Sequence, residues 1–154
     1  MFDRPGRRLT LALLAAVVCA LAGSAVAFAA GSGAPQLVKP GAGKQVKEGK
    51  IRLVVKDTSA DARQFGVFVA INHHKKLDKN HELASSCNVD KGCDFVKLKR
   101  WAHHPGMWTY TAHFSFPGYW ATTAGRYFWQ ANHVGGNSRS GHVTSAIHSF
   151  RVVR

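Results

Sequence analysis

Acidic residues are scarce in this chain, in which 8 Asp and Glu stand against 21 Lys and Arg, for a formal net charge of +13. No closely spaced pair of carboxylates lies on one face of a predicted strand, so the two converging acids of a glycosidase are missing. The sequence also lacks a Gly-x-Ser-x-Gly nucleophile elbow and a Gly-rich loop that leads into a helix to hold phosphate. We therefore expect a protein that is not an enzyme, with no catalytic residues and no cofactor.

Helical periodicity is missing after residue 45, and strict alternation of apolar and polar residues takes its place. Such alternation is typical of strands with one buried face. Alternating runs begin at Ile51, Phe65, Trp108 and Tyr127 and include Phe150, and a further short strand is expected at 36–38. The clearest run predicts that one set of side chains faces the core, namely Trp108, Tyr110, Ala112, Phe114 and Phe116. About seven strands predict an all-β, two-sheet antiparallel β-sandwich, with a small closed barrel as the alternative.

Two of the alternating runs are irregular. Residues 95–101 carry several cations, which discourage edge-to-edge pairing, and this predicts an edge strand. Val143 and Ile147 have the opposite parity to Phe150, so we expect a β-bulge within the last strand.

The first residues have the features of an export signal. Three arginines precede a nearly unbroken run of Leu, Ala and Val over residues 9–26, which leads into Ala-x-Ala sites that end at Ala27 and Ala29. A signal peptidase recognises this order of features. We expect cleavage near Ala27 or Ala29, giving a secreted or extracytoplasmic bacterial protein with no integral membrane span. The alternative is that the apolar run is retained as a membrane anchor.

We expect the signal peptide, residues 1–29, to be followed by a flexible lead-in over 30–45 and one domain over 46–154.

Cysteines are few, and because Cys19 lies in the predicted signal, the mature chain keeps Cys87 and Cys93. They flank the turn-forming sequence Asp-Lys-Gly, and in an oxidising compartment they predict a short disulfide loop. A redox or metal pair is the alternative, although the spacing is not Cys-x-x-Cys.

The two ends of the alternating region carry recognisable motifs. Pro-Gly-Ala-Gly at 40–43 leads to the strand at 51–55, and the closing part contains Gly-x-Tyr-x-Trp at 125–129 and Ser-Phe-x-Val at 149–152. In these features the chain resembles bacterial immunoglobulin-like and fibronectin type III-like domains over about residues 35–154. The resemblance implies an extracellular binding or spacer module, and it makes Tyr127 the candidate for a corner tyrosine. The chain departs from the immunoglobulin pattern in having no cysteines spaced to bridge two sheets.

The excess of positive charge suggests what such a module would bind. Basic domains attract anionic polymers and surfaces, although the charge can also serve solubility alone. Lys97, Lys99 and Arg100 form the densest basic cluster, and Trp101 beside them offers an aromatic face. We expect these residues to bind an anionic polymer or a cell-surface protein; the sequence leaves the oligomeric state open.

Nine histidines support one alternative function, that of an exported metal-binding protein. Imidazole is a common ligand of transition metals. If the segment after residue 72 folds close to the turn before Pro105, two pairs could meet at one metal, namely His73, His74, His103 and His104. No spacing matches an established zinc motif such as His-Glu-x-x-His, so no metal site is assigned.

Overall fold

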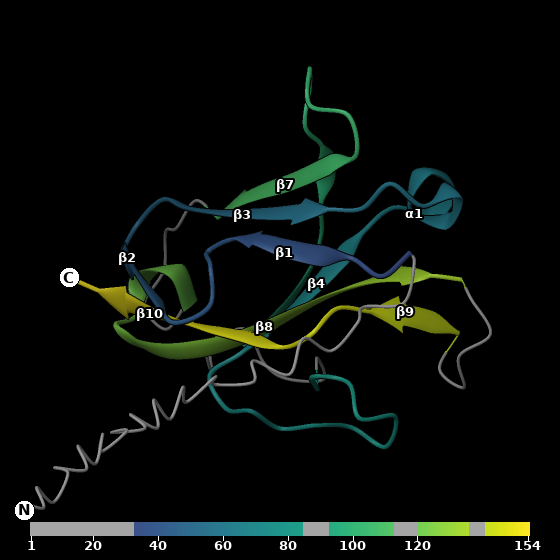
Figure 1. The fold of residues 1–154 in the computed structure, drawn as a ribbon. Helices are drawn as coiled ribbons and strands as arrows, with labels where there is room; N and C mark the ends of the chain where they lie inside the picture. The colour runs from purple at the N-terminus through teal and green to yellow at the C-terminus, as the bar shows by residue number, and fades with distance from the viewer. Residues whose placement is uncertain (1–32, 85–92, 113–119, 136–140) are drawn as a thin grey trace, which may run out of the picture.

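A computed structural model of the chain describes residues 33–84, 93–112, 120–135 and 141–154 (Figure 1). The predicted signal peptide and the residues Cys87, Phe114 and Phe116 lie outside these ranges. The described residues are mostly β, with ten strands, one short α-helix and one 3-10 turn: β1 (Gln36–Lys39), β2 (Lys44–Lys47), β3 (Ile51–Lys56), α1 (Ala60–Phe65), β4 (Phe68–Asn72), β5 (Asp94–Lys97), β6 (Lys99–Arg100), β7 (Met107–Ala112), η2 (Trp120–Thr122), β8 (Gly125–Val134), β9 (His142–Thr144) and β10 (His148–Val153). None of the helices in these ranges has the length and apolar character needed to cross a membrane.

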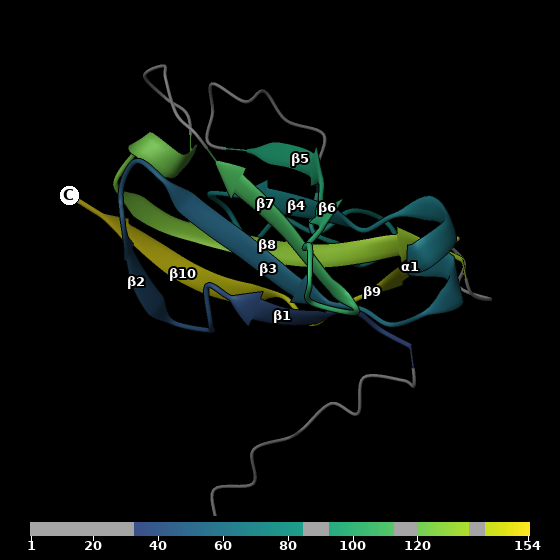
Figure 2. The ribbon, with the colours of Figure 1, turned by 90° about the horizontal axis from the view of Figure 1, so that it is seen from above.

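The strands form two sheets that face each other as layers (Figures 1 and 2). The four-stranded sheet has the order β1-β3-β7-β6, and the six-stranded sheet has the order β2-β10-β8-β4-β5, with β9 paired to β8. The prediction of a purely antiparallel sandwich is wrong, because β2 pairs with β10 in parallel. The chain leaves β1 in one sheet, crosses to the other as β2, and there runs in the same direction as the last strand.

The predicted inward faces form the core between the sheets. Tyr127, Trp129 and Ala131 of β8 and Phe150 and Val152 of β10 are buried together in one apolar cluster. On the opposing sheet, the described part of the predicted inward set also joins this cluster, with Trp108 and Ala112 buried and Tyr110 partly buried against it. The register deduced from the alternation of these strands is therefore confirmed.

The expectation that no helix follows residue 45 is wrong, because α1 precedes β4. Ser59 caps this helix, since its hydroxyl accepts a hydrogen bond of 3.0 Å from the Ala62 N–H. Gly66 ends it with a φ of 92°. Phe65, expected to begin a strand, is therefore the last helical residue and is 42% exposed, whereas Val67 is fully buried.

The predicted edge strand over 95–101 consists of two short strands, one at the edge of each sheet. Lys97 of β5 pairs with Phe68 in the six-stranded sheet, and Lys99 of β6 pairs with Thr109 in the four-stranded sheet. The buried Leu98 lies between them, and its N–H donates to the Val67 carbonyl at 2.8 Å. One continuous segment therefore closes the same side of both layers (Figure 2).

The last part of the chain contains the expected change of parity, but as an interruption between two strands. Thr144 pairs with Asn132 and His148 pairs with Trp129, so β8 spans this interval with one residue fewer than its partner. At the start of the domain, β1 and the first half of β2 fall within residues 30–45, so both sheets include residues from the segment predicted as a lead-in.

Candidate functional site

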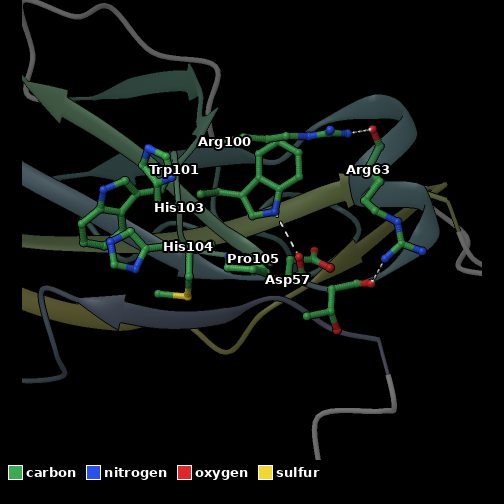
Figure 3. A pocket seen from close by; sticks show the side chains of 11 residues that line it. Asp57, Arg63, Arg100, Trp101, His103, His104 and Pro105 are labelled. Carbon is green, nitrogen blue, oxygen red and sulfur yellow. Dashed lines mark hydrogen bonds between the residues drawn. The ribbon is translucent and has the colours of Figure 1, made fainter.

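A pocket of about 490 Å³ lies beside the β6–β7 hairpin and the start of α1 (Figure 3). We call it the Trp101 pocket. Its lining comes from three parts of the chain: Asp57, Thr58, Arg63, Arg100, Trp101, His103, His104, Pro105, Gly106, Met107 and Trp108. The pocket therefore combines two guanidinium groups, two indoles and two imidazoles.

The hairpin loop that forms one wall is tightly hydrogen-bonded. The Trp101 N–H donates to the Met107 carbonyl at 2.9 Å, and the His104 N–H donates to the Trp101 carbonyl at 3.1 Å. His103 has a φ of 62°, in the left-handed region that side chains other than glycine seldom adopt. Gly106 has a φ of 69°, and a Cβ at this position would lie 2.5 Å from Thr58 Cγ2. Both the left-handed backbone and the close approach of Thr58 therefore require glycine here.

Asp57 anchors the floor of the Trp101 pocket through its backbone and its side chain. Its N–H donates to the Gly106 carbonyl at 2.8 Å, and its carbonyl accepts from Trp108 Nε1 at 3.0 Å. Its carboxylate points away from the pocket, with Oδ2 2.6 Å from His133 Nδ1 and Oδ1 accepting from the Ser59 N–H. Because the Asp57 side chain is 1% exposed, this carboxylate is not accessible to a ligand in the pocket.

The two guanidinium groups are each oriented by the backbone around α1. Arg63 Nη1 donates to the Thr58 carbonyl at 2.6 Å, and Arg100 Nη2 donates to the Arg63 carbonyl at 2.5 Å (Figure 3). The Arg100 guanidinium also lies over the Trp108 ring, 5.5 Å from its centroid. A guanidinium carries five N–H donors, so each arginine keeps donors for a ligand after making its backbone bond. Neither arginine forms an ion pair with an acid of the described residues.

The half-buried Trp101 presents an aromatic surface at the other end of the pocket. Its ring centroid lies 4.1 Å from that of His104, and the Arg52 guanidinium lies 5.5 Å from the Trp101 centroid. These contacts hold the indole in one orientation, and a flat apolar face beside positive charge suits a ligand with both a ring and an anion.

The structure separates the four predicted binding residues. Arg100 and Trp101 line the Trp101 pocket, whereas Lys97 and Lys99 are exposed and do not line it. Lys97 Nζ lies over Phe68, 5.3 Å from the ring centroid, on the other sheet. The separation follows from the change of sheet at residue 98.

The four histidines proposed as metal ligands also divide into two environments. His103 and His104 line the Trp101 pocket, while His73 packs its ring 5.2 Å from that of Tyr127. In the ranges that the structure describes, no group of three or more His, Cys, Asp or Glu residues could hold a metal ion. Cys93 is buried and disulfide-bonded, and since Cys87 lies outside those ranges, the pairing of the two stays a prediction.

Sequence reasoning missed the residues that support the pocket. Neither Arg63 nor Asp57 is among the predicted site residues, because the helix α1 that positions Arg63 was not expected. The usable signal was Ser59 followed by Asp61, because a serine N-cap with an acidic residue in the first turn is typical of the start of a helix. No local pattern could have paired Asp57 with His133, because they lie on different elements and are 76 residues apart.

Comparisons with known proteins assign this chain to no family. No protein-family model and no curated protein matches it. Among solved structures, it is similar to a crystal structure of an engineered protein, with a TM-score of 0.48 and 13% sequence identity. The match covers 82% of this chain and 21% of the engineered chain, so this chain spans about a fifth of that protein.

Proposed function

We propose that this protein is a secreted or cell-surface, non-enzymatic binding domain of immunoglobulin-like or fibronectin type III-like kind. Besides the two facing sheets, one detail supports this relationship. The Tyr127 hydroxyl donates to the Thr123 carbonyl at 2.9 Å, which is the backbone bond that a corner tyrosine makes. The parallel pairing of β2 with β10 departs from the purely antiparallel sandwich that the resemblance predicted.

The ligand we propose is an anionic polymer bound at the Trp101 pocket. The observation that carries this proposal is the pair of guanidinium groups, Arg63 and Arg100, beside a pocket whose one carboxylate is buried and engaged elsewhere. Guanidinium groups bind carboxylate, sulfate and phosphate through paired N–H donors. Trp101 adds a ring-sized face next to them, which favours a polymer built of sugars.

Dextran sulfate and uncharged dextran provide a direct test, because they share a sugar backbone and differ in charge. We expect the protein to bind dextran sulfate, with an affinity that falls steeply as salt rises, since bound polyanions release counterions. The variant R63Q/R100Q should weaken this binding about tenfold or more at low salt.

The variant K75Q/K76Q is the matched control, because it removes the same charge from exposed positions outside the pocket. Equal loss of affinity in both variants would show that net charge alone drives binding. No binding of dextran sulfate at low salt would overturn the proposal and leave a spacer or protein-binding module.

Amino-terminal sequencing of protein recovered outside the cell tests secretion, with Phe28 or Ala30 as the expected first residue.

A further inference from the structure

A second concave surface, which we call the lysine groove, lies where β1, β2 and β3 meet. Its volume is about 570 Å³, and the residues that line it are Val38, Lys39, Pro40, Gly41, Lys44, Gln45, Val46, Lys47, Lys50, Ile51 and Arg52. Five of these residues are cations and none is acidic. This concentration was not predicted, because the cations are spread over residues 39–52 and come together only when β2 crosses to the other sheet.

The cations of the lysine groove have no ion-pair partner among the residues that the structure describes. All five cationic residues are exposed. Glu48 is close in sequence but does not line the groove. Like charges held this close together repel one another, so an anion in the groove would be attracted by several cations at once.

One side chain connects the two cavities. Arg52 lines the lysine groove, and its guanidinium lies 5.5 Å from the centroid of Trp101, which lines the Trp101 pocket. We propose that the pocket and the groove are two parts of one binding track, and that its ligand is a linear acidic polysaccharide long enough to occupy both. This inference rests on the proposed function, which it extends from a single pocket to an extended site.

The residue types of the lysine groove favour this class of polymer. Four of its five cations are lysines, whose ammonium groups are point charges on flexible stems. Such groups suit a chain whose charges vary in position, whereas the guanidinium pair of the Trp101 pocket suits one well-placed anion. The groove has no aromatic side chain, and proteins that hold single-stranded nucleic acid generally stack bases on aromatic rings.

A length series of sulfated oligosaccharides tests the shared track. A ligand that reaches both cavities gains from multivalency, so affinity should rise steeply once the chain exceeds the length that fills one cavity. In the variant K44Q/K47Q this rise should disappear. Its affinity for long chains should fall about tenfold at low salt, and the slope of log affinity against log salt should decrease by about 1 to 2.

The variant R52Q tests the connection itself. It removes the cation at the junction and keeps every lysine of the groove, and we expect a smaller ratio between the affinities for the longest and the shortest oligosaccharide. K75Q/K76Q again serves as the control, because both lysines are exposed and line neither cavity, and the segment 73–84 that contains them lies below the six-stranded sheet in Figure 1. Thermal unfolding of each variant shows whether the fold is retained.

The outcomes separate this inference from the proposed function. If R63Q/R100Q weakens binding but K44Q/K47Q leaves the length dependence intact, the shared track is wrong and the single-pocket proposal stands. If neither pair of changes weakens binding more than the control, both proposals are wrong. Single-stranded DNA of matched charge that binds more tightly than the longest oligosaccharide would overturn the assignment of ligand class.

Discussion

His133 Nδ1 lies 2.6 Å from Asp57 Oδ2, and both side chains are almost completely buried although they are 76 residues apart in the chain. The Asp57 carbonyl also accepts from the Trp108 indole N–H, and the Asp57 N–H donates to the Gly106 carbonyl. The pair therefore joins β8, in one sheet, to the wall of the Trp101 pocket next to the other sheet. Stability of the fold and shape of the pocket depend on the same residue.

Replacing Asp57 by Ala should be strongly destabilising. Removing Asp57 leaves the buried imidazole of His133 without its hydrogen-bond partner, which costs about 1–3 kcal/mol. Urea denaturation measures this loss in the free energy of unfolding. Glu48→Ala, which removes an exposed carboxylate, should change it by less than about 0.5 kcal/mol. Similar losses in the two variants would contradict the importance of the pair.

Gly106→Ala should lower the stability of the fold by more than the backbone strain at this position alone explains. Gly141 makes a useful comparison, because its φ of 70° nearly equals the 69° of Gly106 but, apart from its chain neighbours, no atom of the described residues lies within 4 Å of its Cβ position. Gly141→Ala should cost about 1 kcal/mol for the left-handed backbone. Gly106→Ala adds the collision with Thr58, so we expect a larger loss of stability and weaker binding of dextran sulfate. Equal melting temperatures for the two variants would show that the loop absorbs the new methyl group.

Trp129→Ala should cost about 3–5 kcal/mol, because the side chain is fully buried between the sheets and its removal leaves a cavity. Phe95→Ala is the comparison, since Phe95 is 48% exposed and stacks on Phe68 at 5.5 Å on the sheet surface. This second change should cost about 1 kcal/mol. Denaturation midpoints of the two variants measure the difference, and a smaller effect at Trp129 would be incompatible with its place in the core.

His148 should make the fold less stable in acid. Burial lowers the pKa of His148 below its ordinary value of 6.5, and the atom Nδ1 has no hydrogen-bond partner in the described residues. The unfolded chain therefore takes up a proton at higher pH than the folded chain does. This contribution to stability is complete above about pH 6.5 and is lost as the pH falls through the lower folded pKa.

The variant His148→Gln isolates that effect. Between pH 7.5 and pH 5, the wild-type protein should lose more unfolding free energy than this variant does. His103→Gln, which removes an imidazole from an exposed position, is the control variant in the same measurement. If His148→Gln loses as much stability as the wild type over the same pH range, the imidazole is not buried enough to matter.

Alternation of residue types was sufficient to predict much of the fold. The register of β3, β7, β8 and β10 followed from it, because each of these strands has one face against the core. The helix α1 was missed for a physical reason: its six residues make less than two turns, and Phe65 continues the alternation of the strand that follows. The direction of β2 was also unpredictable, since pairing with β10 depends on contacts between the two ends of the domain.

The candidate site was predicted only in part. Arg100 and Trp101 were identified as neighbours in sequence, and the hairpin keeps them together in the pocket. Lys97 was predicted to join them but lies on the other sheet, because the chain passes from one sheet to the other at the buried Leu98. Arg52 reaches Trp101 through the pairing of β3 with β7, a long-range contact that the local pattern of charges does not contain.

The position of β10 has a consequence for how the domain is made. This strand lies between β2 and β8 in its sheet but follows both of them in the chain. While the polypeptide emerges amino-terminus first, the edges of β2 and β8 that will receive β10 remain unpaired, and unpaired edges invite association with other chains. Folding of this sheet can finish only when the last strand is available, so pairs far apart in sequence should make it slow. A chaperone that shields those edges until β10 has emerged would therefore increase the fraction of the protein that reaches its native form.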